Sequence, residues 1–250
     1  MKNQFYSGII VLLMVFTTQT TTAQDKTYEV EAFEKVIVSP HIEVTLMEGD
    51  EESVTINNAK VAMDKINVTV EGKTLRLYLD DARVVTKSEK IKNDNWKGSR
   101  SIYNGTQATA TITYKKLKRL SVRGEESVRV TSAMNQKDLK LTIYGESKVY
   151  FDDLTTEELT VAIYGESYLE LADGSVGRQV YRAYGESEVN ASGIRNKSTK
   201  ITAYGESNFR VKVSDRLKVT CYGETNINYL GSPVVDKGIV IGEAAIRKIG

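Results

Sequence analysis

The residues of this sequence that are best suited to binding or chemistry form a short motif that recurs. Tyr-Gly-Glu-Ser begins at Tyr144, Tyr164, Tyr184 and Tyr204, and Tyr-Gly-Glu-Thr begins at Tyr222. If equivalent residues of successive copies stack, the copies form one column of phenols and one of carboxylates. Stacked carboxylates can bind Ca²⁺ or the basic groups of a partner. The carboxylates are Glu146, Glu166, Glu186, Glu206 and Glu224, preceded by Glu125 or Glu126 in a degenerate copy.

Two interpretations of this acidic row stay open. At a spacing of about 5 Å, neighbouring carboxylates repel by roughly 1 kcal/mol even in a water-like dielectric. Bound Ca²⁺ or a cationic ligand could offset this repulsion, and no other cofactor is expected. Alternatively, duplication has copied an exposed turn residue whose charge is screened by salt at little cost.

The tyrosine column also has two interpretations. An outward strip of aromatic rings could contact sugar rings or a protein partner. It could instead be an external ladder that fixes the register of the strands. The candidate ligand-binding residues are the five tyrosines and five glutamates: Tyr144, Tyr164, Tyr184, Tyr204, Tyr222, Glu146, Glu166, Glu186, Glu206 and Glu224.

No catalytic residues are predicted. The two catalytic carboxylates of a glycosidase need different environments, whereas the repeated glutamates have nearly equivalent environments. His41 is the only histidine and Cys221 the only cysteine, so neither a triad nor a zinc site can be assembled. The leading interpretation is a non-enzymatic protein that binds a glycan or a cell-surface protein. The alternatives are a polysaccharide-active enzyme of the pectin-lyase-like type and a purely structural envelope protein.

Positioning these columns requires a regular scaffold, and the glycine spacing indicates one. Corner glycines occur at 124, 145, 165, 185, 205, 223 and 242, so the period is 18 to 21 residues. Apolar residues alternate on both sides of each glycine, as in Leu139, Leu141 and Ile143, which is typical of half-buried strands. A hairpin meander would need different turn residues. We therefore predict an all-β, single-stranded, right-handed parallel β-helix with about 20 residues per coil.

The chain divides into an export signal and one domain. Residues 1–23 combine Lys2, the apolar run Ile9–Phe16 and small residues before Gln24, as in a signal peptide. Residues 24–250 form a single β-helix domain, with N-terminal coils over 28–79, a polar insertion loop over 80–106 and repeat coils over 107–250. We expect export to the periplasm, the outer-membrane surface or the medium.

The charge balance excludes one class of partner. The chain has 34 basic and 33 acidic residues, so no net field attracts nucleic acid. After residue 23 no stretch is apolar enough to predict a transmembrane segment.

Several stretches of the sequence, together with the glycine corners, carry a resemblance to a known family: Ala23-Gln24, Phe33–Val38, His41–Val44, Val68–Leu75 and Tyr229–Pro233. Taken together, these features resemble the family named "putative auto-transporter adhesin, head GIN domain". The resemblance spans nearly the whole chain after the signal, although this sequence has Gly-Glu-Ser where the family has smaller corner residues. It implies a right-handed β-helix similar to pectin lyases in shape, a role in adhesion and no agreed catalytic residues.

Overall fold

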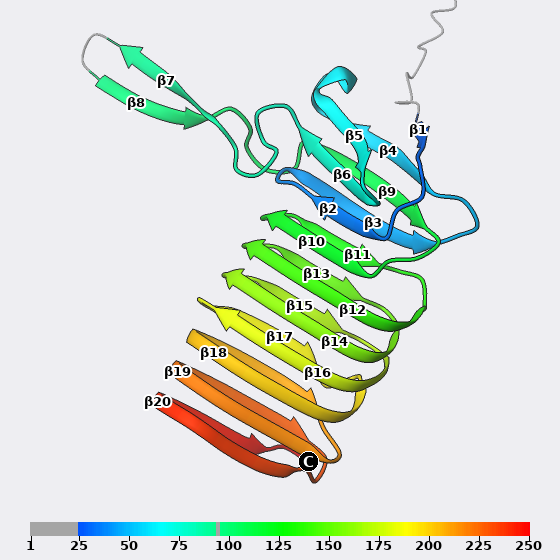
Figure 1. Ribbon diagram of the computed structural model, residues 1–250. Helices are drawn as coiled ribbons and strands as arrows, with labels where there is room; N and C mark the ends of the chain where they lie inside the picture. The colour runs from blue at the N-terminus through cyan, green and yellow to red at the C-terminus, as the bar shows by residue number, and fades with distance from the viewer. Residues whose placement is uncertain (1–24, 94–95) are drawn as a thin grey trace, which may run out of the picture.

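The computed structural model describes residues 25–93 and 96–250, so the predicted signal peptide lies outside the described residues. The fold is a β-solenoid of about six turns with about 20 residues per coil (Figure 1). Neighbouring coils pair in parallel, and the pairs include Tyr144 with Tyr164 and Tyr164 with Tyr184. The predicted parallel β-helix of stacked repeats is therefore confirmed.

Each repeat contributes a long strand, a glycine corner and a second strand. In the last three coils the two strands run together as one. The long strands are β10 (Arg119–Gly124), β12 (Met134–Gly145), β14 (Leu154–Gly165), β16 (Gly174–Tyr184), β18 (Arg195–Lys212), β19 (Arg216–Leu230) and β20 (Val234–Lys248). The second strands are β11 (Ser127–Val130), β13 (Lys148–Phe151), β15 (Tyr168–Leu171) and β17 (Ser187–Ala191).

Apolar residues alternate with outward-facing ones along each strand, so the equivalent apolar residues of successive coils stack as columns in the core. Ile143, Ile163, Ala183, Ala203 and Cys221, which precede the tyrosines, are all buried, as the alternation predicts. Successive side chains of a strand point to opposite faces, so each tyrosine beside them points outward. The solenoid interior is thus filled by side chains that one coil could not bury alone.

The corner glycines allow the coils to approach each other closely. Gly165 has a φ of +115°, a conformation that side chains rarely adopt. A Cβ atom added there would lie 2.5 Å from the carbonyl oxygen of Gly145 in the preceding coil. Glycine is therefore required by both backbone conformation and packing.

The serine that follows each glutamate points into the solenoid. Ser147 is fully buried, and its hydroxyl donates a hydrogen bond of 2.9 Å to the carbonyl oxygen of Gly124. Ser167 donates in the same way to Gly145, also at 2.9 Å. These bonds occupy carbonyl groups of the corner that would otherwise be buried with fewer partners.

The N-terminal region is only partly coiled. β2 (Lys35–Val38) and β3 (Ile42–Glu48) form a coil that pairs with β10 and β11 on one side. On the other side it pairs with β6 (Thr74–Leu79) and β9 (Ala108–Tyr114). Chain order and stacking order therefore differ here. The remaining elements, β1 (Lys26–Glu29), β4 (Ser53–Ala59), the 3₁₀ turn η1 (Met63–Lys65) and β5 (Ile66–Glu71), include antiparallel pairs that cover this end.

The segment 80–106, predicted as a polar loop, instead contains a hairpin. β7 (Ser88–Asn93) pairs antiparallel with β8 (Trp96–Ser101), and the hairpin projects away from the solenoid (Figure 1). Glu89 lies opposite Arg100, a pairing of unlike charges that favours this register. Backbone pairing thus gives these polar residues a structure that their weak hydrophobic pattern did not predict. Among the described residues, no helix has the length and apolarity needed to span a membrane.

Candidate functional site

The five tyrosines form a continuous stack on the outside of the solenoid, which we call the tyrosine ladder. Neighbouring ring centroids are 4.7 to 5.1 Å apart and the ring planes differ by 2 to 10°. At the N-terminal end, the guanidinium of Arg123 lies 5.6 Å from the ring centroid of Tyr144. The ladder residues are Tyr144, Tyr164, Tyr184, Tyr204 and Tyr222.

This stacking changes what the ladder can offer to a ligand. The faces of the inner rings are turned toward the tyrosines above and below, and Tyr164 is 40% exposed. A sugar ring stacks on an open aromatic face, and such faces are largely covered here. The ladder therefore presents ring edges and hydroxyl groups, which donate and accept hydrogen bonds. The structure favours the ladder as a stabilising element and leaves only its edge for recognition.

The five repeated glutamates are exposed, and parallel pairing brings them into one row beside the tyrosine ladder, as predicted. We call Glu146, Glu166, Glu186, Glu206 and Glu224 the glutamate row. The register also shows which of Glu125 and Glu126 belongs to the row, because Gly124 pairs with Gly145 and Val128 with Val149. Glu125 therefore extends the row. Glu126 takes the place of the buried serine.

A shallow groove of about 300 Å³ runs along the glutamate row. Its lining also includes Lys148, Tyr168 and Glu188, each of which lies two residues after a glutamate of the row. Burial raises the pKa of Tyr168, and the hydrogen bond that its hydroxyl donates to Glu170 raises that pKa further. In the described part of the chain, no three His, Cys, Asp or Glu side chains converge as metal ligands. Binding of Ca²⁺ along the row stays a prediction.

A cavity of about 620 Å³ lies at the N-terminal end of the ladder. Its lining combines the base of the insertion with the first corners and includes His41, Val85, Tyr103, Glu126 and Tyr144. Glu126 is only 7% exposed, and one of its oxygens lies 3.6 Å from Nδ1 of His41. The other accepts a hydrogen bond of 3.0 Å from the backbone N–H of Glu125.

His41 joins the insertion to the solenoid. Its Nδ1 lies 2.9 Å from the carbonyl oxygen of Gly105, and Nε2 lies 2.7 Å from the hydroxyl of Thr86. Because a carbonyl oxygen only accepts, Nδ1 donates in the first of these bonds. The ring of Tyr103 lies 5.7 Å from the imidazole. His41 thus holds both ends of the insertion over the first corner.

The sequence matches the family described as "Putative auto-transporter adhesin, head GIN domain" over residues 32–233. The chain belongs to this family. No protein with a curated function matches the sequence significantly.

Solved structures share the architecture of this head GIN domain. A "putative adhesin" from Bacteroides fragilis is similar with a TM-score of 0.75 and 20% identity, covering 90% of this chain and 96% of the other. A "putative adhesin" from Parabacteroides merdae has a TM-score of 0.64 and 18% identity, with coverage of 91% and 96%. A "putative lipid binding protein" from Parabacteroides distasonis gives the same four values. At these identities, the likeness concerns the fold.

The sequence did not reveal the end cavity of the head GIN domain. Its walls come from the opening turn, both ends of the insertion and the first two repeat corners, which are far apart along the chain. One signal was available: Glu126 stands at the serine position of the motif. A substitution of a buried serine by glutamate indicates a corner with different surroundings.

Proposed function

We propose that this head GIN domain is a non-enzymatic, exported, adhesin-like protein that binds a protein partner bearing basic groups. The binding surface consists of the tyrosine ladder and the glutamate row. The observation that carries this proposal is the parallel register, which repeats one hydroxyl and one carboxylate per coil along one side of the solenoid. Membership in an adhesin family supports the broader role.

The chemistry of the surface favours a protein over a neutral glycan. Carboxylates repeated along an edge attract lysine and arginine side chains and increase the rate of association. The tyrosine hydroxyls add hydrogen bonds at the same spacing. A glycan is the second candidate, favoured by these hydroxyls, although the covered ring faces remove the usual stacking contact with sugars.

Charge removal along the row tests this proposal. The variant E166Q/E186Q/E206Q keeps the shape of the surface and loses three negative charges. The control E43Q/E157Q/E158Q removes three exposed carboxylates from other places. Binding of the labelled mature chain to intact cells should fall about tenfold in the row variant and stay unchanged in the control.

Equal binding by both variants and the parent would contradict a role for the row. A separate arm addresses the enzyme alternative. Incubation with acidic and neutral polysaccharides should release no new reducing or unsaturated ends. Release of such ends would assign the solenoid to a carbohydrate-active enzyme instead.

A further inference from the structure

The hairpin of β7 and β8 carries an excess of positive charge on one of its two faces. Its strands contain one acidic residue and four basic ones: Glu89, Lys90, Lys92, Lys97 and Arg100. Glu89 lies opposite Arg100, and Lys92 lies opposite Lys97. Residues that pair across a hairpin share a face, as do residues two apart along a strand. Lys90, Lys92 and Lys97 therefore lie on one face without an acidic residue, which we call the lysine face.

The lysine face is unfavourable for the hairpin taken alone. Like charges directly opposite each other destabilise a pair of strands, and Lys92 and Lys97 form such a pair. Lys90 is exposed and adds a third positive charge two residues away from Lys92. The hairpin projects away from the solenoid, which separates it from the glutamate row of its own chain (Figure 1). A counter-charge for the lysine face therefore has to come from solution or from another molecule.

The glutamate row has the opposite charge and the same disadvantage. Its five carboxylates are exposed, and none of them forms an ion pair among the residues that the structure describes. Neighbouring carboxylates are one coil apart, about 4.8 Å, and repel each other. Lys92 and Lys97 are also one strand spacing apart. The two surfaces thus match in charge and in spacing.

We infer that the lysine face of one copy docks on the glutamate row of a second copy. This inference rests on the proposed function and names the partner whose basic groups the row binds. The groove of about 300 Å³ along the row offers the lysines four carboxylates, those of Glu146, Glu166, Glu186 and Glu206. Because two different surfaces meet, the contact is heterologous, and a pair of copies joined by it keeps one free row and one free hairpin.

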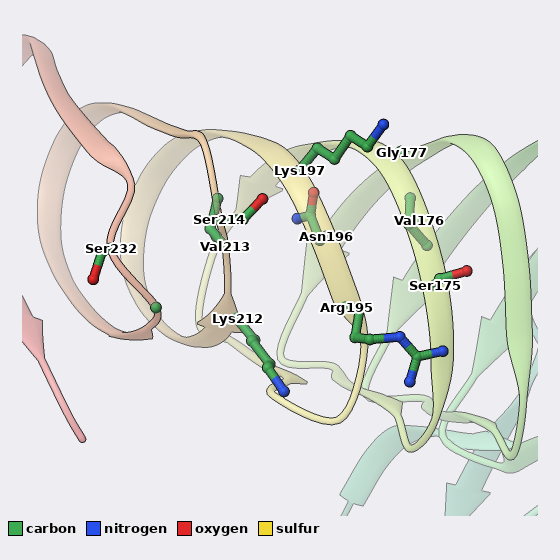
Figure 2. Close-up of a pocket in the computed structure, with 11 residues that line it drawn as sticks. Ser175, Val176, Gly177, Arg195, Asn196, Lys197, Lys212, Val213, Ser214 and Ser232 are labelled. Atoms are coloured by element: carbon green, nitrogen blue, oxygen red, sulfur yellow. The ribbon is translucent and has the colours of Figure 1, made fainter.

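A second basic cluster of the chain is a competing partner for the row. Arg195, Lys197 and Lys212 are exposed around one corner of the solenoid. Figure 2 shows their side chains extending from different parts of this corner, so they do not form one compact face. They also lie on the body of the solenoid and not on a projecting element. The cluster has the same number of positive charges as the lysine face and therefore provides a matched control.

The test is sedimentation velocity of the mature chain at low ionic strength. The hairpin variant K90Q/K92Q/K97Q removes the charges of the lysine face, and the row variant E166Q/E186Q/E206Q removes three charges of the row. The controls are R195Q/K197Q/K212Q and E43Q/E157Q/E158Q, whose residues are exposed elsewhere. The parent and both controls should self-associate as the protein concentration rises. The association constant should fall about tenfold or more in the hairpin variant and in the row variant.

Mixing the two variants separates a direct contact from an indirect effect. The hairpin variant keeps an intact row, and the row variant keeps an intact lysine face. An equimolar mixture should therefore form complexes of one copy of each, at concentrations where either variant alone is monomeric. Added salt should dissociate these complexes, because the contact is between exposed charges.

Three results would overturn the inference: a parent that stays monomeric at every concentration, a mixture that does not associate, and loss of association in R195Q/K197Q/K212Q. The last of these would assign the contact to the solenoid corner. A monomeric parent that binds phosphatidylglycerol vesicles, and a hairpin variant that does not, would assign the lysine face to anionic lipid.

The cell-binding assay reports separately on the proposed function. If the row variant loses cell binding while the parent stays monomeric, the inference fails and the proposed function stands. If the copies associate through the row while the row variant binds cells like the parent, the proposed role of the row in binding cells fails instead.

Discussion

At the scale of single residues, the corner of each coil depends on one missing side chain. Gly165 combines a φ of +115° with an approach of 2.5 Å between an added Cβ and the oxygen of Gly145. The two costs have different origins, since one is local to the residue and the other comes from the neighbouring coil. A second glycine with positive φ and open surroundings can separate them.

Backbone strain alone at this position is expected to cost about 1–3 kcal/mol. We predict that Gly165→Ala lowers the free energy of unfolding by more than this strain. The added Cβ meets backbone, which cannot move aside without shifting a coil. Gly72→Ala is the control, because Gly72 has a φ of +53° and nothing within 4 Å of an added Cβ. It should cost only about 1–2 kcal/mol. Urea unfolding measures the free energy of unfolding of both variants. Equal losses would show that the contact between coils does not contribute to the destabilisation.

At the scale of elements, the tyrosine ladder acts as a stack. The rings of Tyr164 and Tyr184 are 4.9 Å apart with planes 2° from parallel. An offset aromatic pair contributes about 0.5–1.5 kcal/mol beyond the area that it buries. Because each inner ring has two neighbours, the stabilisation is shared along the ladder. A surface column can thus hold the register of strands whose outward positions differ from coil to coil.

We predict a favourable coupling of about 0.5–1.5 kcal/mol between Tyr164 and Tyr184 in a double-mutant cycle with alanine. The matched control is the pair Tyr164 and Tyr204, which share the same column but are separated by one coil. Its coupling should be close to zero. Thermal or urea unfolding of the single and double variants gives both values. Equal coupling in the two cycles would rule out direct stacking as the source.

At the scale of the whole molecule, the two ends of the solenoid differ. The N-terminal end is covered by antiparallel strands, whereas β20 pairs only with β19 in the described structure. Val234 and Ile241 on β20 are 72% and 61% exposed. In a repeat fold, each coil is stabilised by its neighbours, so a coil with one neighbour is the weakest.

We predict that amide hydrogens of residues 234–248 exchange fastest among the coils, and those of residues 154–165 slowest. Local opening of β20 exposes little buried apolar surface, whereas opening of β14 disrupts coils on both sides. Hydrogen exchange followed by mass spectrometry at low protein concentration measures this difference. Protection of β20 equal to that of β14 would show that its free edge is covered by another molecule.

The sequence alone determined the repeat, and it determined which side chains of each strand face the core and which face the surface. Period-2 alternation is a local property of an extended chain, so Ile143 could be assigned to the core and Tyr144 to the surface without coordinates. The glycine period then indicated coils that stack in parallel. The predicted export signal and its consequences lie outside what the structure describes.

Only the tertiary structure decided what these surfaces can bind. The faces of Tyr164 are covered by residues 20 positions away on either side, and Glu126 turns inward because of the register of its coil. The end cavity needs both ends of the insertion together with the first repeat corners. Such features depend on contacts between distant residues, whereas a repeat pattern reports only on the spacing of neighbours along the chain.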